Sequence, residues 1–91
     1  MGQQEVDAAV RNFFEMNDLE GLPESKLTLT VAEDKTGGDP SAFGDALREL
    51  RTEMLGASEI SECTISGGVR GLNVNLSVSA FNRMKSKALE E

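Results

Sequence analysis

The run of eight residues from Leu72 to Ser79, LNVNLSVS, alternates apolar and polar side chains without interruption. Because successive side chains of a β-strand point to opposite faces of a sheet, this pattern predicts a strand with one buried and one solvated face. The buried face would carry Leu72, Val74, Leu76 and Val78, and the solvated face Asn73, Asn75, Ser77 and Ser79. Such a strand needs partner strands and an apolar layer packed on one side. The chain must therefore build a sheet.

Two other segments have strand patterns. Residues 26–33 alternate Leu27, Leu29 and Val31 with threonines, which suits a strand with one solvated face. Residues 59–66 form a weaker pattern in which Cys63 and Ile65 share a face. The glycine-rich segment 67–71 separates this strand from the 72–79 strand, and its length predicts a hairpin connection.

Three segments have helical patterns. Apolar residues recur at helical spacing over residues 3–17, which predicts an amphipathic helix. A second helix is expected to begin after Asp39, a favourable N-cap that is followed by Pro40, and to end at Gly56. A third helix is expected over residues 80–91, with Ser79 as its cap. The order is therefore α-β-α-β-β-α.

This order predicts one α+β domain over residues 1–91, with a three-stranded mixed sheet and helices packed on one face. The mixed sheet follows from treating the first strand, the second helix and the second strand as a right-handed crossover unit. The pattern leaves the order of the strands in the sheet open.

Composition disfavours most enzyme classes. The chain has no histidine, which removes the commonest general base and most transition-metal sites. The only cysteine, Cys63, lies among apolar residues of a predicted strand and is interpreted as a buried, inert thiol. No motif for a cofactor or metal is found. We therefore expect a non-catalytic protein that uses no cofactor, metal or small-molecule substrate.

The same features bear on the compartment. A single cysteine excludes an internal disulfide, so a reducing, cytoplasmic compartment is expected. The first residues lack the basic segment of a signal peptide, and no apolar run approaches the length of a membrane span. A membrane role is not expected.

Charge is distributed unevenly. Residues 1–62 carry fourteen acidic and five basic side chains, whereas residues 63–89 carry no acid and four bases, Arg70, Arg83, Lys85 and Lys87. The GxxG spacing of residues 68–71 is similar to the nucleic-acid-clamping loop of KH domains, but that loop joins two helices, and here it joins two predicted strands. The net charge of −7 also opposes attraction to phosphates, so nucleic acid is not the expected partner.

The uncharged 72–79 strand indicates a protein–protein interaction module. Edge strands are normally protected by charge or proline, and the 72–79 strand has neither. If this strand is at an edge it could pair with another chain, and if it is central its exposed face could be covered by a partner or a second copy. We expect self-association, as a homodimer, through the 72–79 strand or its exposed face, with Asn73, Asn75, Ser77, Ser79, Arg70, Arg83 and Lys85 as candidate partner-binding residues.

One alternative is a small acidic regulator, of phage or mobile-element type, that blocks a nucleic-acid-binding protein by charge mimicry. It would use Glu5, Asp7, Glu15, Asp45, Glu49 and Glu53. A second alternative is weak RNA or anion binding through the basic C-terminal third.

Overall fold

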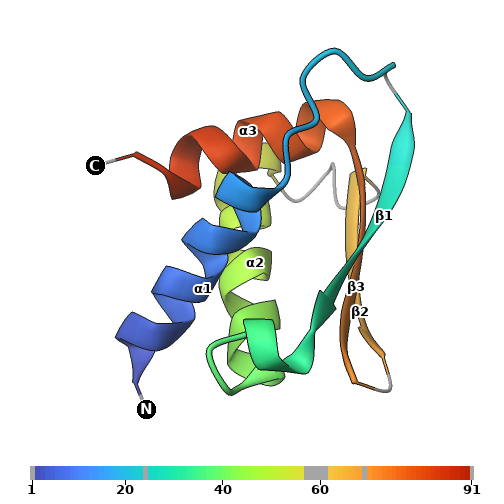
Figure 1. The fold of residues 1–91 in the computed structure, drawn as a ribbon. Coiled ribbons are helices and arrows are strands. Elements are labelled where there is room, and N and C mark those ends of the chain that lie inside the picture. The colour runs from blue at the N-terminus through green and yellow to red at the C-terminus, as the bar shows by residue number, and fades with distance from the viewer. Residues whose placement is uncertain (1, 24, 57–61, 69, 91) are drawn as a thin grey trace.

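The computed structural model describes residues 2–23, 25–56, 62–68 and 70–90. Its elements are, in chain order, α1 (Gln3–Met16), β1 (Lys26–Ala32), the short 3-10 helix η1 (Glu33–Lys35), α2 (Pro40–Leu55), β2 (Cys63–Gly68), β3 (Gly71–Ser77) and α3 (Val78–Ala88) (Figure 1). The predicted order and the α+β class are confirmed. The predicted strand residues 59–61 lie outside the described residues.

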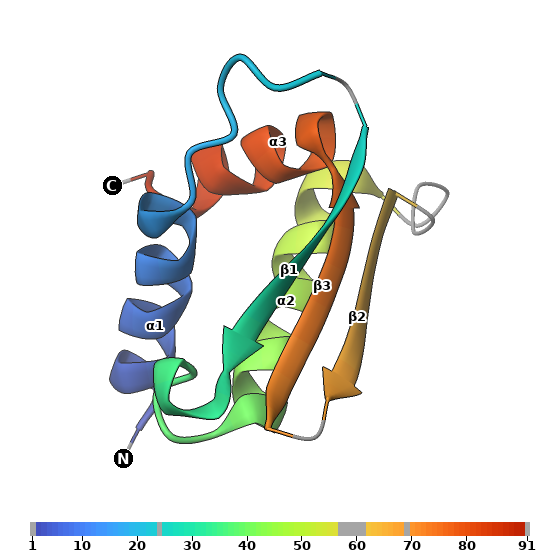
Figure 2. The same ribbon diagram turned by 45° about the vertical axis from the view of Figure 1, so that its right-hand side comes forward.

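The three strands form one sheet in the order β1-β3-β2, and each adjacent pair is antiparallel. The prediction of a mixed sheet is therefore wrong in this respect. The connection through α2 does make β1 and β2 parallel, but β3 lies between them and is antiparallel to both (Figure 2). All three helices cover the same side of the sheet, as predicted.

The junction of β3 and α3 comes earlier than its pattern predicts. The strand ends at Ser77, and Val78 is the first residue of α3. Ser77 Oγ accepts a hydrogen bond from the Ala80 amide at 3.1 Å, so Ser77 rather than Ser79 is the N-cap of α3. Val78 remains buried because the first turn of the helix packs toward the core. Apolar–polar alternation cannot mark this boundary.

The connection between β2 and β3 is shorter than the five residues expected. Gly68 pairs directly with Gly71, so only residues 69 and 70 link the two strands. Gly71 has a φ of +150°, and a side chain there would meet the Val31 carbonyl of β1. The glycine at the start of β3 therefore permits a close approach between two strand backbones.

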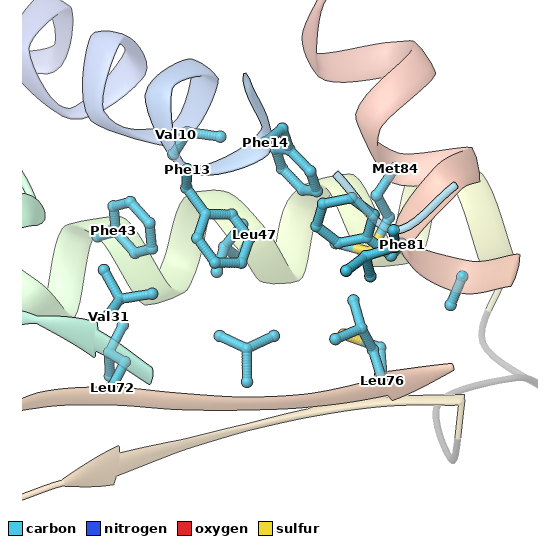
Figure 3. Packing of buried hydrophobic residues seen from close by; sticks show 14 of the residues in the cluster. Val10, Phe13, Phe14, Val31, Phe43, Leu47, Leu72, Leu76, Phe81 and Met84 are labelled. Carbon is cyan, nitrogen blue, oxygen red and sulfur yellow. The ribbon is translucent and has the colours of Figure 1, made fainter. Parts of the chain in front are cut away.

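The core lies between the helices and the sheet. All four phenylalanines are buried, two on α1 (Phe13 and Phe14) and one each on α2 (Phe43) and α3 (Phe81). They face Val31, Leu72 and Leu76 of the sheet (Figure 3). At Gly44 of α2, an added Cβ would lie 3.3 Å from Arg48 Nη1 and 3.4 Å from Leu72 Cδ1, which are both ends of side chains, so the contact of this helix with β3 does not require glycine there.

Candidate functional site

The solvent side of the sheet carries two rows of small, uncharged side chains. The strand register aligns Thr30 of β1, Asn73 of β3 and Ser66 of β2 in one row, and Thr28, Asn75 and Thr64 in the next. All are exposed except Asn73, which is half-buried. We call these six residues the polar sheet face.

Two hydrogen bonds order this face. Thr28 Oγ1 donates to Asn75 Oδ1 at 3.1 Å, and Thr30 Oγ1 donates to Asn73 Oδ1 at 3.3 Å. Cross-strand pairs of this kind stabilise a sheet modestly and restrict the side-chain rotamers. The polar sheet face is therefore partly preorganised, and a partner would have fewer side chains to immobilise on binding.

Of the four polar residues predicted on this strand, two lie elsewhere. Ser77 is only 8% exposed, caps α3 and donates a hydrogen bond of 2.8 Å to Glu62 Oε2. Ser79 is exposed but belongs to the first turn of α3. The face expected from the sequence is thus reduced to Asn73 and Asn75 on β3, and it is extended by threonine and serine side chains of the neighbouring strands.

The position of β3 also removes one of the two expected routes of self-association. Both edges of β3 are paired, one with β1 and the other with β2. A strand in the centre of a sheet has no free backbone groups with which to pair another chain. The edge-pairing prediction for the 72–79 strand is therefore wrong, and the exposed face remains.

The basic residues of the C-terminal third do not converge. Arg70 lies at the β2–β3 connection, at the end of β3 opposite α3. On α3, Arg83 donates a hydrogen bond to the Met54 carbonyl of α2, and Lys85 Nζ donates one of 3.3 Å to the Asn17 carbonyl. Lys85 also lies 5.8 Å from the centre of the Phe81 ring. These contacts are intramolecular, so the residues do not form one anion-binding surface.

Two of the acidic side chains considered for charge mimicry form ion pairs within the described residues. Asp45 pairs with Arg48 at 3.2 Å, and Glu53 pairs with Lys87 at 3.3 Å. The hydrogen bond and charge of Glu53, together with the charge of Glu90, raise the pKa of Lys87. The others, Glu5, Asp7, Glu15 and Glu49, are exposed on α1 and α2. Basic residues thus interrupt the acidic helical surface.

Cys63 is fully buried at the start of β2. Burial raises the pKa of its thiol, and the nearby Arg51 guanidinium offsets part of that rise. A thiol that stays protonated and inaccessible is a poor nucleophile. Its placement agrees with the interpretation of a buried core thiol.

Two features of the sheet edges were not predicted. Arg48 and Arg51 of α2 donate hydrogen bonds to carbonyls of β2, at Ile65 and Cys63. A groove of about 470 Å³ lies between α1 and β1. Neither feature has a signal in the alternation of the strands, because both depend on which strand is at an edge and which helix lies beside it.

The fold and surface define the class of this protein: a small α+β domain with a helix-covered antiparallel sheet, in which the two central rows of the solvent face are uncharged. Comparisons with protein-family models, with curated proteins and with solved structures find no match to this chain. No helix within the described ranges combines the length and apolar character needed to cross a bilayer. In the same ranges, no three acidic or thiol side chains gather where they could hold a metal ion.

Proposed function

We propose that this protein is a non-catalytic protein–protein interaction module that self-associates as a homodimer through the polar sheet face. The observation that supports the proposal is the absence of charge in the two central rows of this face, within a chain that is 27% charged. Two copies, each with a net charge of −7, repel one another over most of their surfaces. The polar sheet face is a place where they can meet without opposing like charges.

The size of the face limits the strength of the dimer. The central part of a three-stranded sheet measures roughly 15 Å by 20 Å, or about 300 Å². A standard interface buries about 800 Å² on each partner. We therefore expect a weak dimer, with a dissociation constant on the order of 0.1 mM.

Sedimentation equilibrium from roughly 10 µM to 1 mM, around the expected dissociation constant, tests the proposal. In the Asn75→Lys variant, two lysines would face each other near the two-fold axis of the dimer, and we expect association to weaken at least tenfold. The matched control is Asn82→Lys, which changes the net charge equally at an exposed position on α3. A strictly monomeric protein at 1 mM, or equal association of the two variants, would contradict the proposal.

Salt dependence separates this proposal from charge mimicry. Association through uncharged side chains should change little between low and moderate salt, or strengthen as screening reduces the repulsion between copies. An inhibitor that imitates phosphates would lose affinity for its basic target steeply with salt. The pairing of Asp45 and Glu53 with bases makes this alternative the less supported of the two.

A further inference from the structure

The backbone ladder of the sheet shows which groups of β1 face outward. At one end of the β1–β3 pair the Glu33 amide donates to the Arg70 carbonyl at 2.8 Å, and at the other end the Val78 amide donates to the Ser25 carbonyl at 3.3 Å. Both pairs continue the β1–β3 register. Because hydrogen-bonded and non-hydrogen-bonded pairs alternate in an antiparallel ladder, Thr28 and Thr30 must direct their N–H and C=O groups away from β3.

The opposite edge of the sheet is covered. The same alternation turns the Cys63 and Ile65 carbonyls of β2 outward, and Arg51 Nη1 and Arg48 Nη2 donate hydrogen bonds to them at 3.4 Å and 3.3 Å. On β1, no side chain of the described residues donates to the carbonyls of Thr28 or Thr30. The two edges therefore differ: α2 protects β2, whereas no described side chain covers the backbone of β1 at Thr28 and Thr30.

A groove runs beside the open edge. It lies between α1 and β1, with a volume of about 470 Å³. Its lining includes apolar side chains of both elements, among them Ala9, Phe13 and Val31. Met16, which is 69% exposed, also lines it. The core side of β1 is incompletely covered here, since Leu29 remains half-buried rather than buried.

We propose that this groove binds an extended peptide segment of a partner protein, which adds to β1 as a fourth strand. The residues of the added strand opposite Thr28 and Thr30 would form hydrogen bonds with the backbone of these two threonines. The side chains of these added residues would lie on the solvent side of the sheet. The alternate residues, opposite Leu29 and Val31, would point into the groove toward Phe13 and Met16. This is strand addition, in which backbone bonds supply affinity and alternate side chains supply specificity.

The charge of the groove indicates the chemistry of the segment. Glu5 and Asp34 line the end of the groove near Gly37 together with one base, Lys35, so this end has a net charge of −1. The whole chain has a net charge of −7. A segment with apolar residues at alternate positions and a lysine or arginine near the Asp34 end fits both the shape and the charge.

The position of α1 argues for a segment rather than the edge strand of a second copy. Figure 2 shows α1 in the helical layer at the β1 side of the sheet, and α1 and β1 line the same groove. In a two-fold pairing of β1 with β1, each copy would bring its own α1 to the space that the other α1 occupies. An isolated extended segment brings no helical layer and avoids this conflict.

Selection of ligands from a displayed library of random eight-residue peptides on the full chain tests the proposal. We expect enriched sequences to alternate apolar and polar residues and to include lysine or arginine. In the complex with a selected synthetic peptide, hydrogen exchange of the Thr28 and Thr30 amides should slow at least tenfold. N-methylation of the peptide amides that face β1 should weaken binding at least tenfold, whereas N-methylation of the intervening amides should change it less than about twofold.

Two pairs of variants control for folding. Thr30→Pro removes an outward N–H that β3 does not use, and Gly67→Pro does the same on the β2 edge. We expect the first to abolish binding and the second to leave it unchanged. Ala8→Trp fills the groove from an exposed position on α1 and should abolish binding as well. Its control, Ser86→Trp, lies at an exposed position on α3 outside the groove and should leave binding unchanged. The proposal is overturned if no peptide is enriched over Thr30→Pro, or if the amides that the peptide protects lie on β2 or β3 rather than at Thr28 and Thr30. It is also overturned if the Thr28 and Thr30 amides become equally protected when the protein is concentrated without peptide.

Discussion

Arg48 on α2 donates a hydrogen bond from Nη2 to the carbonyl oxygen of Ile65 on β2, at 3.3 Å. The donor reaches the outer edge of an edge strand, where an unpaired carbonyl would otherwise be available to another chain. Its other terminal nitrogen, Nη1, contacts the Asp45 carboxylate at 3.2 Å, which holds the side chain in place. Arg48 thus links the acidic helix surface to the protection of the sheet edge.

Arg48→Ala is therefore expected to expose the β2 edge. In the Asn75→Lys background, where the polar sheet face is blocked, light scattering near 0.1 mM should show concentration-dependent species larger than a monomer. The loss of one hydrogen bond should lower the free energy of unfolding by about 1 kcal/mol. Arg83→Ala is the matched control, because Arg83 donates to the Met54 carbonyl on a helix rather than to a strand edge. Equal scattering by the two variants would show that Arg48 does not protect the edge.

Ser77→Ala is expected to destabilise the fold more than Ser79→Ala. Ser77 Oγ caps α3 and donates to Glu62, so its removal should lower the free energy of unfolding by about 1–2 kcal/mol. Ser79 is exposed in the first turn of α3 and is not its N-cap, so its replacement should lower the free energy of unfolding by less than that of Ser77. Urea denaturation of the two variants measures the difference. If Ser79→Ala destabilised the protein more than Ser77→Ala, Ser79 rather than Ser77 would be the N-cap of α3.

The Ser77–Ser79 boundary shows what a local pattern can and cannot predict. The alternation of residues 72–76 predicts both faces of β3 correctly, because each side chain in that run meets either the core or solvent, whereas Ser77, expected on the solvated face, is buried. The pattern continues for two residues into α3 only because Val78 is buried in both a strand and this helix turn, and Ser79 is exposed in both. A tertiary contact, the Val78 amide with the Ser25 carbonyl, accompanies the change to helix.

The order of the strands and the protection of the sheet edges could not be predicted from the sequence, for a different reason. An α-helical connection between β1 and β2 is compatible both with adjacent parallel strands and with the observed insertion of β3 between them. The choice decides which of the candidate residues form one surface. Asn73 and Asn75 lie together on the polar sheet face, whereas Arg70 is separated from Arg83 and Lys85 by the length of β3. Spacing along the chain carries no information on this separation.

Gly71→Ala is expected to destabilise the protein by about 2–3 kcal/mol. The φ of Gly71 is +150°, and an added Cβ would collide with the Val31 carbonyl of the neighbouring strand. Gly67 provides the matched control, because no atom lies within 4 Å of a Cβ built there. Gly67→Ala should change the free energy of unfolding by less than about 0.5 kcal/mol. Similar midpoints of thermal unfolding for the two variants would contradict the close approach of β3 to β1.

Ionisation of the Cys63 thiol makes the free energy of unfolding depend on pH in the alkaline range. Burial raises the pKa of its thiol above the ordinary value of 9.0, so the native state keeps the proton where the unfolded chain has lost it. The contribution of the buried, protonated thiol to stability is therefore fully present below pH 9 and is lost as the pH rises above 9. The free energy of unfolding should fall by at most about 1.4 kcal/mol per pH unit through this ionisation. Cys63→Ala removes this ionisation, while the other groups that titrate in this range are unchanged. Urea denaturation of both proteins from pH 7 to 10.5 should show the wild type losing stability faster than the variant above pH 9, and parallel curves would contradict a raised pKa.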